Sequence, residues 1–206
     1  FELEDNNKGN ISIASESGSW ITQITNWAEK RGLRLGKAIS VGNEANVDIT
    51  DCLEYYLEDP CTKTVGLYVE GIKKNGRKFV NTLTELSDKK PVVVYYSGGT
   101  TAGSRAGMSH TASIGGAPEI YDSIIHSSGA IKAGSIEELY EFLHAFSKIN
   151  PPKGKRMGLI TNSGGPAVTL ADLCEKNGLL VPQYSASLQS EIRAIIPKVA
   201  SPGNPV

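Results

Sequence analysis

The segment Gly107–Gly116 carries one histidine, His110, among small and hydroxylated residues. Apolar residues do not recur around it at helical or strand spacing, as they would around a histidine of a hydrophobic core. The pattern therefore predicts a loop that presents the imidazole, and loops on a rigid scaffold often carry reactive groups. An imidazole can act as an acid, a base, a metal ligand or a covalent nucleophile. Metal binding is the least favoured role, because no second His or Cys lies two to four residues further on.

A carboxylate partner for this histidine is suggested by Glu70. A nucleophilic imidazole needs one free ring nitrogen and a group that holds the other nitrogen as a donor. Glu70 directly follows the predicted strand Val65–Val69, and the segment with His110 follows the next predicted strand, Pro91–Tyr95. Parallel pairing of these strands would bring both residues to one edge of the sheet. Taken alone, Glu70 also fits an exposed carboxylate that opens a loop.

Two turns, at Ile13–Ser19 and Ile160–Gly165, share one design, in which Ser and Gly join a predicted strand to a predicted helix. A helix N-terminus offers unpaired N–H groups and a partial positive charge, which suit an anion such as phosphate. Each turn alone also fits an ordinary helix cap. Because the design occurs in both halves of the chain, we expect a phosphate-binding role for Ser17, Gly18, Ser19, Ser163, Gly164 and Gly165.

The remaining histidines and the cysteines give weaker indications of a functional role. His126 and His144 lie in or beside predicted helices, where a solvated or capping role is expected. Cys52, Cys61 and Cys174 lack the spacing of a metal site. Reduced thiols of an intracellular protein are the simplest interpretation.

The hydrophobic pattern alternates between strands and helices, which predicts βαβ units and a parallel sheet with helices on both faces. Predicted strands are Ile11–Ala14, Ala38–Val41, Val65–Val69, Pro91–Tyr95, Ala130–Ala133, Met157–Ile160 and Leu179–Val181. Predicted helices are Trp20–Arg31, Asp48–Leu57 with Asp48 as N-cap, Phe79–Leu86, Pro118–Ile125, Ile136–Phe146, Ala167–Lys176 and Leu188–Ile196.

The polar, proline-rich segment Asn150–Lys155 is the best candidate for a domain boundary. It divides the chain into residues 1–149 and residues 150–206. The second part is short for an independent α/β domain and ends in a loop-like sequence. We therefore expect a truncated second domain and a fragment of a longer protein.

Composition narrows the functional classes for these 206 residues. Lys and Arg number 21 and Asp and Glu number 22, for a net charge of −1, and no basic run suggests nucleic-acid binding. No apolar run approaches the length of a membrane span, and the acidic N-terminus lacks the character of a signal peptide. We expect a cytoplasmic protein with no nucleic-acid or membrane partner.

Taken together, the ordered motifs resemble the α-type region of NDP-forming acyl-CoA synthetases, the group that includes succinyl-CoA synthetase and ADP-forming acetyl-CoA synthetase. The resemblance covers nearly the whole chain. The matching segments are residues 15–19 (SESGS), 40–48 (SVGNEANVD), 68–72 (YVEGI), 109–111 (SHT), 161–166 (TNSGGP) and 200–205 (ASPGNP).

This resemblance implies a flavodoxin-like three-layer domain followed by a second, truncated flavodoxin-like domain. It implies that His110 becomes phosphorylated, that Glu70 orients it, and that the two Ser/Gly turns hold the phosphate. The implied reaction makes an acyl-CoA from a small carboxylic acid, CoA and ATP with Mg²⁺, through an acyl phosphate. A CoA-binding Rossmann domain and an ATP-grasp domain or subunit would hold CoA and nucleotide. We therefore expect an oligomer, and no turnover by this chain alone.

Three departures from the family pattern stand out. Glu16 replaces the usual glutamine of Ser-Gln-Ser-Gly, and Ala112 replaces the glycine that usually follows Ser-His-Thr. The segment Tyr95–Thr100 replaces a stretch that often carries Lys and Arg. Two alternative functions stay open: a non-catalytic CoA-binding or scaffold module, and a flavodoxin-like domain for a flavin or nucleotide.

Overall fold

A computed structural model describes residues 9–103, 105, 117–149 and 152–206 of the chain. Its contacts divide the chain into two compact units, Phe1–Asn150 and Pro151–Val206. Among the described residues, no helix is both long enough and apolar enough to cross a membrane.

The first unit is built on a five-stranded parallel sheet with the strand order β2-β1-β3-β4-β5. This order is that of the flavodoxin-like doubly wound fold. It confirms the predicted α/β class with a parallel sheet. The strands are β1 (Ile11–Ser15), β2 (Leu35–Ser40), β3 (Thr64–Val69), β4 (Val92–Tyr96) and β5 (Ile131–Lys132).

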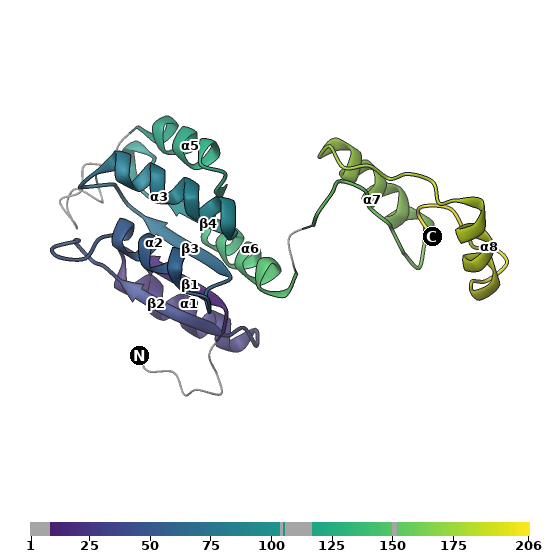
Figure 1. Cartoon of the computed structure of the whole chain (residues 1–206), viewed down its shortest axis with the longest axis horizontal. Helices are drawn as coiled ribbons and strands as arrows, with labels where there is room; N and C mark the ends of the chain where they lie inside the picture. The colour runs from purple at the N-terminus through teal and green to yellow at the C-terminus, as the bar shows by residue number, and fades with distance from the viewer. Residues whose placement is uncertain (1–8, 104, 106–116, 150–151) are drawn as a thin grey trace. The chain divides into compact units, whose positions relative to one another are not determined.

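Helices cover both faces of this sheet, so its central strands are buried on both sides (Figure 1). Residues of α2, α3 and α5 pack in one core cluster, and residues of α1 and α6 pack in the other. Every residue of β3 is buried, which explains its continuous apolar sequence. The helices are α1 (Gly18–Lys30), α2 (Ile49–Glu58), α3 (Gly76–Lys89), α5 (Pro118–Ser127) and α6 (Ile136–Lys148).

Local capping explains where two of the helices begin. Asp48 caps α2 as predicted, and it forms a capping box with Asp51. Helix α3 begins three residues before the predicted Phe79, because the side chain of Asn75 accepts the N–H of Lys78.

The second unit consists of α7 (Gly164–Lys176) and α8 (Ala186–Ile195) joined by extended segments (Figure 1). The strands predicted at Met157–Ile160 and Leu179–Val181 are wrong: the structure has only an isolated parallel bridge between Arg156 and Leu180 there. A strand requires a continuous hydrogen-bonded neighbour, and the described residues of this unit supply only scattered backbone pairs.

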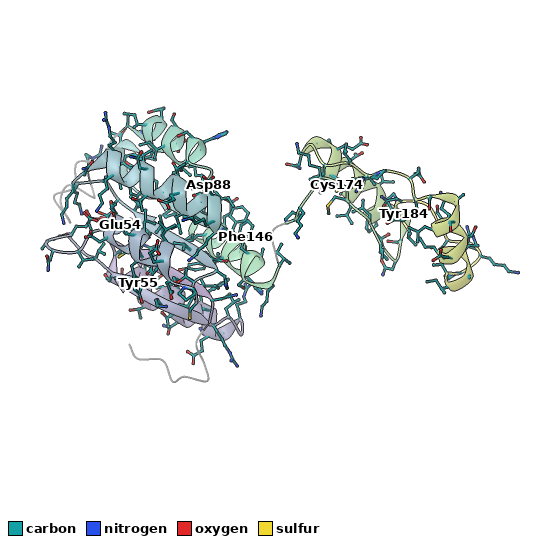
Figure 2. The ribbon with its side chains drawn as sticks, viewed as in Figure 1. Glu54, Tyr55, Asp88, Phe146, Cys174 and Tyr184 are labelled. Atoms are coloured by element: carbon teal, nitrogen blue, oxygen red, sulfur yellow. The ribbon has the colours of Figure 1, made fainter. Side chains whose placement is uncertain are left out.

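The interior of the second unit is small. Leu159, Cys174 and Asn204 are its buried residues within the described part. Figure 2 shows Cys174 on α7 and Tyr184 on the segment between the two helices. The identity of residues 150–206 as the start of a second flavodoxin-like domain stays a prediction.

Candidate functional site

The carboxyl ends of β1 and β3 form the edge of the sheet where a ligand is expected. The strand order reverses between these two strands, because β2 lies on one side of β1 and β3 lies on the other. In open α/β sheets, ligands bind outside the carboxyl ends of the strands at such a switch point. The residues that follow are Glu16 and Ser17 after β1, and Glu70 and Gly71 after β3.

The first Ser/Gly turn leads from β1 into α1 with Ser17 at the N-cap position. The Ser15 hydroxyl donates to the Ser17 carbonyl over 2.8 Å and accepts the Ser17 N–H over 3.0 Å. The Ser17 hydroxyl contacts the Ser19 hydroxyl at 3.0 Å rather than capping the helix. The N-terminus of α1 therefore keeps donors that no side-chain cap occupies.

The second Ser/Gly turn repeats this arrangement in the second unit. The Thr161 hydroxyl donates to the Ser163 carbonyl over 2.7 Å and accepts the Ser163 N–H over 3.4 Å. Ser163 is the N-cap residue of α7, and its side chain makes no capping hydrogen bond. By contrast, side chains cap four other helices, namely Asp48 on α2, Asn75 on α3, Ser135 on α6 and Ser185 on α8.

The glycines of both turns leave room for an anion. A methyl group built on Gly164 or Gly165 would meet no atom within 4 Å, and one built on Gly18 would meet only the Ser40 hydroxyl, at 3.5 Å. Open space at these glycines, together with helix N-termini that no side chain caps, suits phosphate binding.

Glu70 lies directly after β3, as predicted, and is half-buried. Its Oε2 atom is buried, and among the residues that the structure describes it has no hydrogen-bond partner. A buried carboxylate oxygen without a donor is costly, so this atom is suited to accept a hydrogen bond from another group. Burial raises the pKa of the nearby Tyr68 hydroxyl, and the Glu70 charge adds to that rise.

His110 lies outside the described residues. The strand that precedes its segment, β4, does pair in parallel with β3, as the sequence predicted. At the end of β4 the Ser97 N–H donates to the Val69 carbonyl over 2.8 Å, which continues the pairing to the residue before Glu70.

Glu16 is a buried residue that the sequence marked only as a departure from the family pattern. Its side chain has no exposed surface. Oε2 accepts the N–H of Gly71 over 3.0 Å and also the N–H of Glu70. Oε1 forms an ion pair with the Lys73 ammonium at 2.8 Å. The contacts join segments more than fifty residues apart, so no sequence pattern could have identified them.

Glu44 is a second carboxylate near this edge to which sequence reasoning assigned no role. It is 5% exposed and has a positive φ of 59°, which is unusual for a residue with a side chain. Burial raises the pKa of Glu44, against the opposing hydrogen bond from the Ile49 N–H, and the Glu16 charge adds to the rise. Strained backbone and a shifted pKa together often mark functional sites.

The other candidate residues do not assemble into a site. Among the described residues no group of three His, Cys, Asp or Glu side chains could hold a metal ion. Cys52 and Cys174 are buried, Cys61 is exposed, and all three are free. His126 lies near the end of α5 and is exposed, and His144 lies half-buried on α6.

Known proteins resemble the chain over both units. Residues 8–146 match the family described as succinyl-CoA ligase like flavodoxin domain. The α subunit of acetate–CoA ligase (ADP-forming) II from Pyrococcus furiosus is 37% identical over 97% of this chain and 43% of its own length. The 4-hydroxybutyrate–CoA ligase (ADP-forming) of Nitrosopumilus maritimus is 32% identical over 96% of this chain and 28% of its own.

A solved structure extends the similarity to three dimensions. It is the dinucleotide forming acetyl-coenzyme A synthetase 1 of Ca. Korarchaeum cryptofilum in complex with phosphate and ADP. It superimposes with a TM-score of 0.87 at 34% identity, over 97% of this chain and 43% of its own. The chain thus spans less than half the length of each of these three relatives.

Proposed function

The chain belongs to the family of succinyl-CoA ligase like flavodoxin domains, and on that premise we propose that it is the phosphohistidine-bearing part of an ADP-forming acyl-CoA synthetase. Residues 1–149 would form the ligase domain that carries His110, and residues 150–206 would begin a second ligase domain. The names of the relatives, which include acetate and 4-hydroxybutyrate, support a short carboxylic or hydroxy acid as the substrate.

The observation that carries this proposal is the buried Oε2 of Glu70 directly after β3, which has no hydrogen-bond partner among the residues that the structure describes. An acceptor in that state fits a donor N–H of an imidazole, and His110 follows the adjacent strand in the sequence. Accepting this hydrogen bond would fix the tautomer of His110 and stabilise the ring when it becomes cationic.

In the proposed reaction, a ring nitrogen of His110 takes the terminal phosphoryl group of ATP and ADP leaves. The N–P bond then breaks as a carboxylate oxygen of the acid accepts the phosphoryl group, which gives an acyl phosphate. The CoA thiolate attacks the acyl carbon, and phosphate departs as the thioester forms. Ser17, Gly18 and Ser19 at α1, with Ser163, Gly164 and Gly165 at α7, would bind the phosphoryl oxygens.

CoA and nucleotide would be bound mainly by a CoA-binding Rossmann domain and an ATP-grasp domain or subunit outside this chain. Mg²⁺ would accompany the nucleotide and neutralise charge on its phosphates. The chain by itself would then be inactive, and the active enzyme would be a cytoplasmic assembly of several domains or subunits.

The test is phosphorylation of the complete assembly with ATP labelled in its terminal phosphate, in the presence of Mg²⁺. We expect an acid-labile phosphoprotein that is lost in His110→Ala and forms more slowly in Glu70→Gln. Glu85→Gln, on the exposed face of α3, is the matched control and should match the unmodified enzyme. Undiminished label in His110→Ala would exclude His110, and no label in the unmodified assembly would favour the non-catalytic scaffold.

A further inference from the structure

The backbone that carries Glu70 is held by side chains from other elements at three consecutive N–H groups. Glu16, at the end of β1, accepts the N–H groups of Glu70 and Gly71. The Tyr121 hydroxyl, from α5, accepts the next N–H, that of Ile72, over 2.9 Å. Tyr121 is itself stacked on Tyr96 with ring centroids 3.9 Å apart. The start of this loop is therefore set by tertiary contacts and not by a regular turn.

Within these contacts Glu16 has the central position. Its carboxylate is fully buried and meets two adjacent N–H donors at the residue that bears the functional carboxylate and the residue after it. Two N–H groups on one oxygen restrict the peptide planes on both sides of the Glu70 Cα atom. Those planes determine the direction in which the Glu70 side chain leaves the backbone.

The negative charge of the buried Glu16 side chain is balanced by the ammonium group of Lys73. A buried carboxylate without a counter-charge destabilises the fold strongly. The Lys73 ammonium is 2.8 Å from Oε1, and its side chain is 24% exposed, so the lysine reaches the carboxylate from the solvent side. Glu44, also buried nearby, adds negative charge and increases the need for the lysine.

We propose that Glu16 is the positioning residue for Glu70, and that Lys73 is the counter-charge that a carboxylate at position 16 requires. The proposal rests on the proposed function, in which Glu70 orients His110. It has a specific corollary. A glutamine at position 16 accepts the same N–H groups without a charge, so Lys73 should matter when residue 16 is glutamate and be dispensable when it is glutamine.

The first experiment uses this chain alone and measures hydrogen exchange of individual amides by NMR. We expect Glu16→Ala to accelerate exchange at Glu70 and Gly71 by about tenfold or more, because both donors lose their acceptor. Glu16→Gln should keep most of the protection. Lys37→Met is the matched control, because it breaks a similarly placed lysine–carboxylate pair, with Asp59, away from this loop. It should leave both amides unchanged.

The lysine is tested in the same way, and this arm remains informative if Glu16→Ala does not fold. Lys73→Met should accelerate exchange at Glu70 and Gly71 when position 16 is glutamate. The double variant Glu16→Gln with Lys73→Met should exchange at the rate of Glu16→Gln alone. Equal acceleration by Lys73→Met in both backgrounds, or unchanged exchange in a folded Glu16→Ala, would overturn the proposal.

The second experiment measures phosphorylation of the complete assembly. Because Glu16 acts through Glu70, Glu16→Ala should slow labelling about as much as Glu70→Gln, and combining both should slow it little further. Glu16→Gln should restore most of the rate. Independent, multiplicative losses would contradict positioning. If the unmodified assembly takes no label, the proposed function fails, while the exchange experiment still decides whether Glu16 holds the backbone at Glu70.

Discussion

The two Ser/Gly turns have the same hydrogen bonds and different surroundings. In each, a hydroxyl two residues before the N-cap serine bridges the carbonyl and the N–H of that serine. The residue between them differs: Glu16 is 3% exposed, whereas Asn162 is exposed. The first turn follows a strand of a five-stranded sheet, and the second follows a segment in which the structure has only scattered backbone pairs.

The comparison distinguishes the uncapped helix N-terminus, which depends on residues of the turn itself, from the buried contacts of the turn, which depend on neighbouring segments. The bridging hydroxyl and the glycines are enough to leave the helix N-terminus uncapped in both units. In the first unit the loop that follows β3 brings two N–H donors to Glu16. In the second unit the buried polar contact is made by Asn204, whose side chain bonds the Leu159 N–H and the carbonyls of Met157 and Pro182.

The largest effect on stability is expected when the middle residue of each turn is replaced. Glu16→Ala should destabilise the chain by about 2–4 kcal/mol, because it leaves two buried N–H groups without an acceptor. Asn162→Ala, at the equivalent exposed position, should change stability by less than about 0.5 kcal/mol. Urea unfolding followed by circular dichroism measures both. Similar losses in the two variants would mean that the turns do not differ in this way.

Removing the bridging hydroxyl should give a smaller difference in stability between the two turns. Ser15 is 1% exposed and makes two hydrogen bonds, so Ser15→Ala should cost about 1–2 kcal/mol. Thr161→Val removes the equivalent hydrogen bonds, which are exposed, and should cost less than about 0.5 kcal/mol. The same unfolding measurement applies, and an equal cost at both positions would argue against the effect of burial.

Stability should depend on pH near the first turn, because the charge of Glu16 acts on the buried carboxylate of Glu44. Burial raises the pKa of Glu44, so its ionisation costs stability at neutral pH, and this cost disappears below the ordinary glutamate pKa. Glu44→Gln should therefore stabilise the chain at pH 7, and the gain should shrink as the pH falls through the raised pKa. Unfolding at several pH values measures the gain.

The control for this measurement is Glu54→Gln, which alters an exposed carboxylate on α2 (Figure 2). It should show no stabilisation at neutral pH. A gain for Glu44→Gln that did not vary with pH would indicate a cause other than ionisation.

The smallest effect is expected at the glycines, where the two turns should behave alike. Gly18→Ala and Gly164→Ala add a methyl group at the first helical position, where it meets only the Ser40 hydroxyl at 3.5 Å in the first turn and nothing within 4 Å in the second, so stability should change by less than about 0.5 kcal/mol in both. Phosphorylation of the complete assembly should nevertheless slow, because the methyl group reduces the space at the start of the helix where phosphate is proposed to bind. A marked loss of stability in either variant would show that the glycine is needed for folding.

Local patterns in the sequence predicted much of the first unit. The alternation of strands and helices predicted the parallel sheet, and Asp48 was correctly identified as a cap. Both predictions use patterns among residues within a few positions of one another. The strands predicted beyond residue 150 are wrong because a short apolar run becomes a strand only beside a continuous hydrogen-bonded partner, which a local pattern does not reveal.

The candidate site shows the same division. Residue types and strand order placed Glu70 and the turn residues at helix and strand ends from the sequence alone, and His110 was singled out in the same way. Only the tertiary structure revealed that the Glu16 carboxylate accepts the N–H groups of Glu70 and Gly71 and that Lys73 forms an ion pair with this carboxylate. It also revealed that the Tyr121 hydroxyl accepts the N–H of Ile72. Periodicity and capping act through adjacent residues, whereas burying a carboxylate depends on donors that the fold brings from distant segments.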